Sequence, residues 1–182
     1  MSTFTDRPNK ALIVIDVQNG VVGDAWNRAA VLANINTLVD QARAKSVPVI
    51  WVQHSEEEMP IGSDNWQIVA ELSPTDSEPH IRKEYGSSFE ATNLDQVLAD
   101  LKVGQLIICG AQTNNCVRHT SHAALEKGYD ITLVGDAHTT SDVNWGEYQI
   151  KADQVVFEQN LAFLNYALPG RAAQCKLTSE VF

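Results

Sequence analysis

The stretch Leu106-Ile-Ile-Cys-Gly-Ala-Gln-Thr-Asn-Asn-Cys-Val-Arg-His-Thr120 carries most of the information about the fold. It starts with a short apolar run that ends at Gly110, passes through small polar residues, and reaches Cys116 where a helical pattern begins. This order predicts a buried strand, a turn and a helix, with the thiol at the carboxyl end of the strand, where open α/β sheets bind ligands. Because a helix N-terminus favours a thiolate over a thiol, the position suits a nucleophile.

Outward from this stretch, apolar β-branched runs alternate with helical patterns. Runs that are almost continuously apolar are typical of strands covered by helices on both faces. Their alternation with helices indicates βαβ units, and hence a mainly parallel sheet with right-handed crossovers. The expected strands are residues 11–15, 47–52, 106–109, 131–134 and, more weakly, 154–157, and the expected helices are residues 29–45, 93–101 and 117–127, the last of which stops at Gly128.

The composition excludes several classes of protein. With 44% hydrophobic and 20% charged residues among 182, the chain predicts one globular domain over residues 1–182. The net charge of −10 argues against nucleic acid as a partner, because nucleic-acid binding needs a basic surface. No apolar run is long enough to cross a bilayer, and the first residues lack the apolar stretch of a secretory signal. We therefore expect no membrane association and a cytoplasmic location. Three irregularly spaced cysteines predict neither a disulfide framework nor a zinc cluster.

The segment 53–86 differs from the rest of the chain. It contains three prolines and an acidic run at 56–58, and it shows little periodicity. A connection of this length without clear elements is usually functional or disordered. We expect a loop with short helical turns that covers a substrate, and we interpret the acidic run as a solvated face.

Two charged residues are candidate partners of the thiol. Asp16 ends the first predicted strand. A carboxylate is costly in a core, so this acid has either a functional partner or a capping role. Because the carboxyl ends of parallel strands meet at one edge of the sheet, Asp16 and Cys116 are able to converge. Lys83 lies in a polar stretch and, taken alone, is more typical of a surface lysine.

Four segments together resemble the isochorismatase-like cysteine hydrolases, over roughly residues 9–160. They occur in the order that is typical of this family, and the third is the most specific of them. The resemblance implies a three-layer α/β/α sandwich with a mainly parallel central sheet, the Rossmann-like hydrolase fold of that family. The matching segments are Ala-Leu-Ile-Val-Ile-Asp-Val-Gln (11–18), Arg-Lys-Glu-Tyr-Gly-Ser-Ser-Phe (82–89), Ile-Cys-Gly-Ala-Gln-Thr-Asn-Asn-Cys-Val (108–117) and Leu-Val-Gly-Asp-Ala (133–137).

The resemblance implies a catalytic triad of Asp16, Lys83 and Cys116. Cys116 is expected to attack a carbonyl carbon and to form a thioester. Asp16 is expected to take the thiol proton and to return it to the leaving nitrogen. Lys83 is expected to stabilise the thiolate and to hold the acid in position. The resemblance also implies a non-proline cis peptide at Ala111–Gln112, and an oxyanion hole made by the backbone N–H groups of Gln112 and Cys116.

The resemblance argues against a metal ion or another cofactor in this chain. Nicotinamidases of the family bind a metal through an Asp-x-His pair after the second strand, whereas the stretch here reads Gln53-His54-Ser55-Glu56. A metal site needs several ligands in a workable geometry, and the pair is missing. A dinucleotide is not expected either, because no G-x-G-x-x-G follows the first strand.

Several further residues have both a functional and a structural interpretation. Gln18, His54, Trp66 and Phe89 are candidate residues of the substrate pocket, although aromatic side chains in such segments serve equally as plain packing. His119 and His122 offer a histidine base for the thiol, but they are expected to pack or to cap instead. Asp136 is interpreted as a structural residue near the site, Cys109 as a small buried hydrophobe and Cys175 as incidental.

The expected function is hydrolysis of a C–N bond in a small amide or ureido substrate by a cysteine hydrolase. Cys116 favours this acyl chemistry over the alternative within the family, which is hydrolysis of a vinyl ether as in isochorismatase. A redox-responsive or binding protein on the same fold is the alternative outside enzymes. The resemblance also implies a homo-oligomer, either a dimer or a tetramer.

Overall fold

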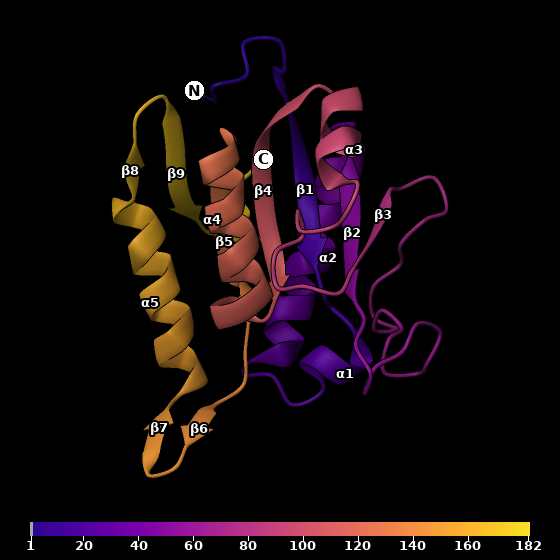
Figure 1. Cartoon of the computed structure of the whole chain (residues 1–182), viewed down its shortest axis with the longest axis vertical. Coiled ribbons are helices and arrows are strands. Elements are labelled where there is room, and N and C mark those ends of the chain that lie inside the picture. The colour runs from indigo at the N-terminus through magenta and orange to yellow at the C-terminus, as the bar shows by residue number, and fades with distance from the viewer. Residues whose placement is uncertain (1) are drawn as a thin grey trace.

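The computed structural model describes residues 2–182 and contains a seven-stranded sheet with helices on both faces (Figure 1). The strand order is β3-β2-β1-β4-β5-β9-β8, in which β8 is antiparallel to β9 and the other neighbours are parallel. The strands of this sheet are β1 (Asn9–Ile15), β2 (Val49–His54), β3 (His80–Lys83), β4 (Val103–Ala111), β5 (Asp130–Thr139), β8 (Ala167–Leu168) and β9 (Arg171–Lys176).

The helices form the outer layers, and a small hairpin lies outside the main sheet. The hairpin pairs β6 with β7 and projects beyond the start of α5 (Figure 1). The remaining elements are α1 (Asn19–Val22), α2 (Arg28–Ala44), α3 (Leu94–Asp100), the π-helical turn η1 (Thr113–Val117), α4 (Arg118–Lys127), β6 (Val143–Trp145), β7 (Tyr148–Ile150), α5 (Ala152–Asn165) and the 3₁₀ turn η2 (Thr178–Glu180).

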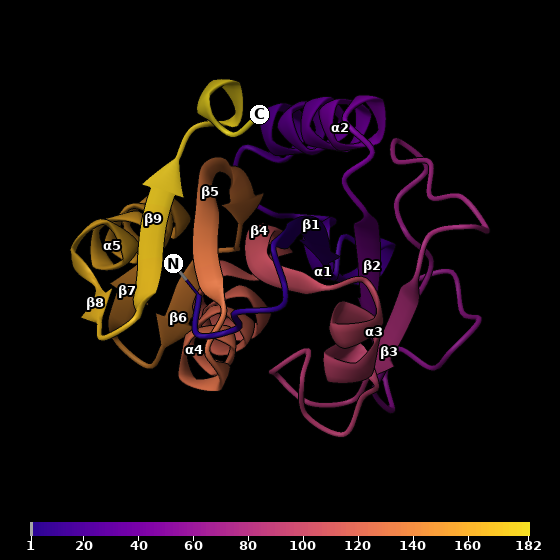
Figure 2. The same ribbon diagram turned by 90° about the horizontal axis from the view of Figure 1, so that it is seen from above.

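The central strand β1 supplies side chains to two cores. Ile13 and Ile15 are buried on the face covered by α3, α4 and α5, whereas Leu12 and Val14 are buried on the face covered by α2 (Figure 2). Successive side chains of a strand point to opposite faces, so a strand buried on both faces must be apolar throughout. The three-layer α/β/α sandwich with a mainly parallel sheet is therefore confirmed.

Most predicted elements are confirmed, and one is wrong. The apolar runs and helical patterns correspond to β1, β2, β4, β5, α2, α3 and α4, and Gly128 ends α4 with a φ of 108°. Residues 154–157 lie inside α5 and form no strand. The buried apolar side chains of α5 are Ala152, Val155, Val156 and Phe163, and this helical spacing outweighs the short β-branched run.

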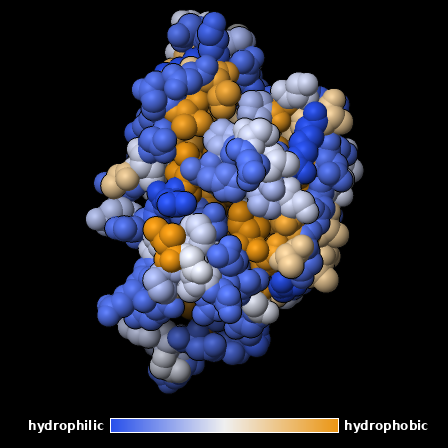
Figure 3. Space-filling model, turned by 90° about the vertical axis from the view of Figure 1, so that its right-hand side faces the viewer, coloured by the Kyte–Doolittle hydropathy of each residue, from blue (hydrophilic) through white to orange (hydrophobic). Residues whose placement is uncertain are grey.

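The segment expected as a covering loop contains a strand that the sequence pattern did not predict. β3 closes it at the edge of the sheet, and residues 55–79 form turns and isolated bridges without any of the expected helical turns. Hydrophilic side chains cover most of the face on this side, with apolar patches between them (Figure 3). None of the helices within residues 2–182 combines the length and the apolar character needed to cross a membrane.

Candidate active site

Three residues from separate elements meet at the carboxyl edge of the sheet. Asp16 follows β1, Lys83 is the last residue of β3, and Cys116 lies in η1 directly after β4. The Nζ atom of Lys83 is 2.6 Å from Oδ2 of Asp16 and 3.2 Å from Sγ of Cys116. The parallel strand order thus brings together residues that are 33 and 67 positions apart, and the lysine lies between the acid and the thiol.

Burial dominates the electrostatics of this group. The side chains of Lys83 and Asp16 are 0% and 1% exposed. Burial raises the pKa of Asp16 above its usual value of 3.8, although the charge of Lys83 acts in the opposite direction. Burial and the negative charge of Asp16 also raise the pKa of Cys116 to about 12. The resting side chain is therefore a neutral thiol, in contrast to the thiolate expected from a helix N-terminus.

The backbone at the end of β1 is held in an unusual conformation. Asp16 has a φ of 48°, in the left-handed region, and its N–H donates to the carbonyl of Val52. Gly110 of β4 lies alongside with a φ of 117°, and a Cβ atom there would be 2.0 Å from the carbonyl oxygen of Ile15. A side chain at Gly110 would therefore displace β1 just before Asp16, which explains the glycine in the sequence.

The turn η1, which carries the thiol, is hydrogen-bonded to a buried histidine. The peptide between Ala111 and Gln112 is cis. His138 of β5 is fully buried, with Nδ1 2.8 Å from Oγ1 of Thr113 in η1 and Nε2 2.8 Å from Oδ1 of Asn160. Burial lowers the pKa of His138 to about 4, so the ring is neutral. Because the amide oxygen of Asn160 only accepts, Nε2 carries the proton and Nδ1 accepts from the hydroxyl of Thr113.

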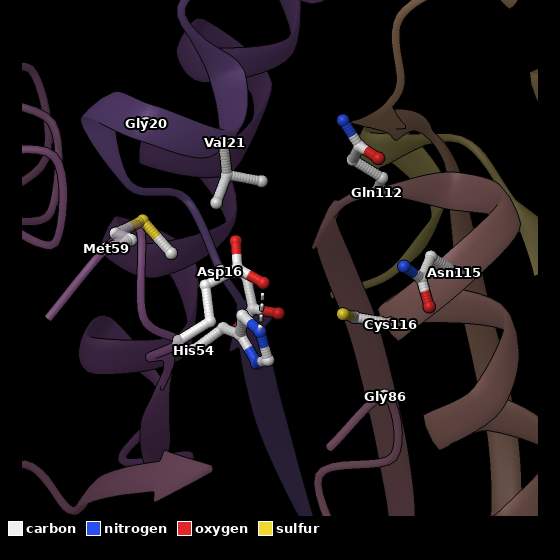
Figure 4. A pocket seen from close by; sticks show the side chains of 10 residues that line it. Asp16, Gly20, Val21, His54, Met59, Gly86, Gln112, Asn115 and Cys116 are labelled. Atoms are coloured by element: carbon white, nitrogen blue, oxygen red, sulfur yellow. Dashed lines mark ion pairs between the residues drawn. The ribbon is translucent and has the colours of Figure 1, made fainter. Parts of the chain in front are cut away.

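A cavity of about 210 Å³ opens above the three residues. Figure 4 shows its two walls: Asp16, His54, Val21 and Met59 face Gln112, Asn115 and Cys116 across the space. Oδ1 of Asp16 has no strong hydrogen-bond donor among the described residues; the carboxylate points into the cavity and interacts with the thiol of Cys116 (Figure 4). The site thus presents a thiol and a carboxylate oxygen to a small ligand.

Of the four candidate pocket residues, only His54 lines this cavity. Gln18 is fully buried, and its amide binds the backbone of His54 and Trp66, so it joins β2 to the following loop. Trp66 packs below Arg82 in a cation–π contact, and Phe89 packs against Tyr129 in the core. These three side chains therefore stabilise the fold. The residue type alone does not distinguish this role from contact with a substrate.

The residues around His54 do not fit a metal ion. Its Nδ1 is 3.3 Å from the ammonium of Lys83, and its Nε2 is 3.6 Å from Oε2 of Glu56. A metal at Nδ1 would meet a neighbouring positive charge, and Glu56 is a single further ligand. Within residues 2–182, no group of three or more histidine, cysteine, aspartate or glutamate side chains is placed to hold a metal.

The other residues singled out in the sequence lie away from the thiol. No hydrogen bond joins a histidine to Cys116 among the described residues. His119 lies against Gly86, where a Cβ would be 2.3 Å from Nδ1 of the ring. His122 makes T-shaped contacts with Phe163 of α5 and with Tyr166, its C-cap. Asp136 accepts from Thr178 near the C-terminus, rather than from a loop at the site. Cys109 is a buried core residue, and Cys175 belongs to β9.

The sequence pattern did not identify six residues of the cavity wall. Glu56 was expected to belong to a solvated face. The side chains of the others do not indicate a particular chemistry; these residues are Gly20, Val21, Met59, Gly86 and Asn115. Gly20 fits close packing, because a Cβ there would be 3.0 Å from Sδ of Met59. The only available signal was position, since each residue lies within a few residues of a predicted strand end or in the covering segment.

Known proteins share this arrangement of elements. Residues 10–160 match the family model described as the Isochorismatase domain. A streptothricin hydrolase of Streptomyces noursei is 31% identical over 144 residues, which are 75% of this chain and 57% of that protein. An N-carbamoylsarcosine amidase of an Arthrobacter species is 28% identical, over 81% of this chain and 66% of that protein. A crystal structure described as an isochorismatase from Pseudomonas putida superimposes with a TM-score of 0.85 at 27% identity, over 96% of this chain and 90% of that one. The chain belongs to the isochorismatase family.

Proposed function

We propose that this chain is a hydrolase that cleaves the C–N bond of a small amide or ureido substrate through Cys116. The contact that carries the proposal is the position of Lys83 Nζ, 2.6 Å from the carboxylate of Asp16 and 3.2 Å from the thiol of Cys116. Membership of the isochorismatase family, with an amidase among the relatives, supports an amide hydrolase. The cavity volume of about 210 Å³ suits a small substrate.

The first step forms a bond between Sγ of Cys116 and the carbonyl carbon of the substrate. Since the pKa of the thiol is raised to about 12, its proton must leave during the attack, and Asp16 is the base that faces it. Burial raises the pKa of Asp16, which makes it a stronger base than an exposed aspartate. Lys83 compensates the negative charge as it moves from Asp16 to the reacting centre.

The second step breaks the C–N bond. The negative charge on the carbonyl oxygen is stabilised by the backbone N–H groups of Gln112 and Cys116, both of which line the cavity. Asp16 returns its proton to the leaving nitrogen, and an acyl thioester remains on Cys116. Water then attacks the thioester with Asp16 as base again, so that one amide and one water give one acid and one amine.

The test is ammonia release from a panel of small primary amides and ureido compounds by the purified protein. We expect turnover of at least one compound, and its loss in Cys116→Ala. Asn114→Ala is the matched control, because Asn114 is in the same turn and does not line the cavity. A Cys116→Ala protein with undiminished turnover would overturn the mechanism, and cleavage of a vinyl ether without any C–N activity would overturn the proposed reaction.

A further inference from the structure

The charged side chains around the cavity carry a net negative charge. Asp16 and Lys83 compensate each other in their ion pair, and Cys116 is a neutral thiol. Glu56 also lines the cavity, and among the described residues its carboxylate, 54% exposed, has His54 as its only ion-pair partner, at 3.6 Å. No lysine or arginine within residues 2–182 lines this cavity.

A second cavity extends this negative region away from the thiol. It has a volume of about 430 Å³ and shares Glu56 with the catalytic cavity. Glu57 and Glu84 line it as well, together with Ser55, Pro60 and Ile61. Among the described residues, no lysine or arginine forms an ion pair with any of these three glutamates. Arg82 lines an adjoining hollow that shares Ser55, Ile61 and Glu84 with this cavity. No ion pair joins Arg82 to Glu84 in the part of the chain that the structure describes.

The carboxylate of Asp16 indicates, independently of Glu56, which hydrogen-bonding group the ligand carries. Oδ2 of Asp16 is paired with Lys83, and among the described residues the remaining donor to this buried carboxylate is the weak S–H group of Cys116. A buried acceptor without a strong donor is costly, so a bound ligand that offers an N–H group there would relieve the cost. An N–H at Asp16 and a positive end near Glu56 are compatible with one small molecule, because both residues line the same cavity.

We propose that the cavity selects amides whose remote end is cationic, and discriminates against amides whose remote end carries a carboxylate. This inference rests on the proposed amide hydrolysis and names its substrate class. Carboxylates in a partly enclosed cleft raise the local concentration of cations and repel anions. The same field disfavours isochorismate itself, a dicarboxylate, and so separates the amide reaction from the vinyl ether reaction.

Three primary amides with the same two-carbon spacing between the amide and the remote group test the selectivity: 3-aminopropanamide, butanamide and succinamate, which carry a positive, a neutral and a negative remote end. Ammonia release is measured for each at low and high ionic strength. We expect kcat/KM to fall in that order, by about tenfold or more from the cation to the anion at low salt. The differences shrink at high salt, because the glutamates are solvent-accessible and screened.

Glu56→Gln is the diagnostic variant, and Glu126→Gln is its matched control. Glu126 lies near the C-terminal end of α4 and lines none of the cavities described above. Both changes remove one negative charge from the chain. We expect Glu56→Gln to reduce kcat/KM for 3-aminopropanamide about fivefold more than kcat/KM for butanamide, and Glu126→Gln to leave all three values unchanged.

The outcomes separate the two proposals. If none of the three amides and no compound of the wider panel releases ammonia, the proposed amide hydrolysis fails. If amides are hydrolysed but succinamate is used as well as 3-aminopropanamide, the hydrolase stands and the charge selectivity is wrong. Equal losses for the cationic and the neutral amide in Glu56→Gln would also contradict it, since they would show a structural effect of that residue.

Discussion

The ammonium of Lys83 and the carboxylate of Asp16 form a 2.6 Å ion pair from which solvent is excluded. Two charges in such a place have each lost their hydration, so neither is tolerated without the other. The pair also sets the chemistry of its neighbour, because the thiol of Cys116 is 3.2 Å from the same ammonium. The burial of two charges and the environment of the thiol therefore depend on one contact between residues at the ends of two strands.

Removal of one member of the pair is expected to destabilise the protein strongly. Lys83→Met leaves the carboxylate of Asp16 buried and uncompensated, which we expect to lower the free energy of unfolding by about 3–5 kcal/mol. The double variant Asp16→Asn with Lys83→Met should regain a large part of this loss, since asparagine also tolerates a positive φ. Urea unfolding followed by circular dichroism measures all three proteins. A single variant as stable as the unchanged chain would show that the pair is not buried in solution.

Cys116 is expected to be a neutral thiol in the free protein. Burial and the charge of Asp16 raise its pKa to about 12. The ultraviolet absorbance of a thiolate should then show no difference between the unchanged chain and Cys116→Ser from about pH 5 to about pH 9, because a group with such a pKa stays protonated there. A titration step within this range that disappears in Cys116→Ser would mean that the thiolate exists before substrate binds.

The rate should decrease in acid because Asp16 must be ionised to act as a base. Burial raises its pKa, so the acid limb of kcat/KM is expected at a pH above the usual 3.8. The sign follows from the charge state: below this pKa the carboxylate is protonated and unable to accept the thiol proton. Initial rates across the acid range, with circular dichroism at each pH to confirm folding, measure the limb. Full activity at pH values below 3.8 would contradict a role for Asp16 as base.

His138 is expected to make the fold sensitive to acid. Its pKa is lowered from 6.5 to about 4, so between these values the unfolded chain binds a proton that the native ring does not. Stability should therefore decrease as the pH falls through this window, by about 3 kcal/mol in total from this residue. The contribution is fully present above pH 6.5.

The matched variant for this prediction is His138→Gln. Glutamine does not titrate, so the dependence of the melting temperature on pH should become flatter between the same two values. It also weakens the support of Thr113, so we expect kcat to decrease more than KM increases. An unchanged pH dependence of stability in His138→Gln would show that another group causes it.

The homo-oligomer implied by the family resemblance remains a prediction. Exposed apolar side chains on α5 and on the β6–β7 hairpin are its expected interface. Phe157, Leu161 and Leu164 are exposed at helical spacing along α5, and Trp145 is 80% exposed on the neighbouring hairpin. Light scattering after size exclusion is expected to give the mass of a dimer or tetramer, and Phe157→Glu to shift it toward the monomer. A monomeric mass for the unchanged chain at all concentrations would refute the prediction.

The sequence allowed the prediction of the fold because its central strands are apolar on both faces. It also placed Asp16 and Cys116 correctly, since both follow such strands and parallel strands end at one edge. The local sequence did not place Lys83 in the site in the same way. β3 has only four residues with an alternating pattern, so a lysine there cannot be distinguished from a surface lysine until its partners are known.

The details of the pocket depend on contacts that the sequence does not encode locally. Gln18 has the residue type of a ligand-binding side chain, but its amide is used by the backbone of His54 and Trp66. The raised pKa of Cys116 has the same origin, because it depends on the depth of burial and on the negative charge of Asp16. A helix N-terminus predicts the opposite direction from the local sequence alone.

The proposed mechanism requires a covalent bond between Cys116 and the acyl group of the substrate. Rapid acid quenching of the protein during turnover of an active amide, followed by peptide mass spectrometry, measures it. We predict the mass of the acyl group as a thioester on the peptide that contains Cys116, and unmodified peptides that contain Cys109 and Cys175. Turnover without acylation of Cys116, together with undiminished turnover in Cys116→Ala, would contradict the mechanism.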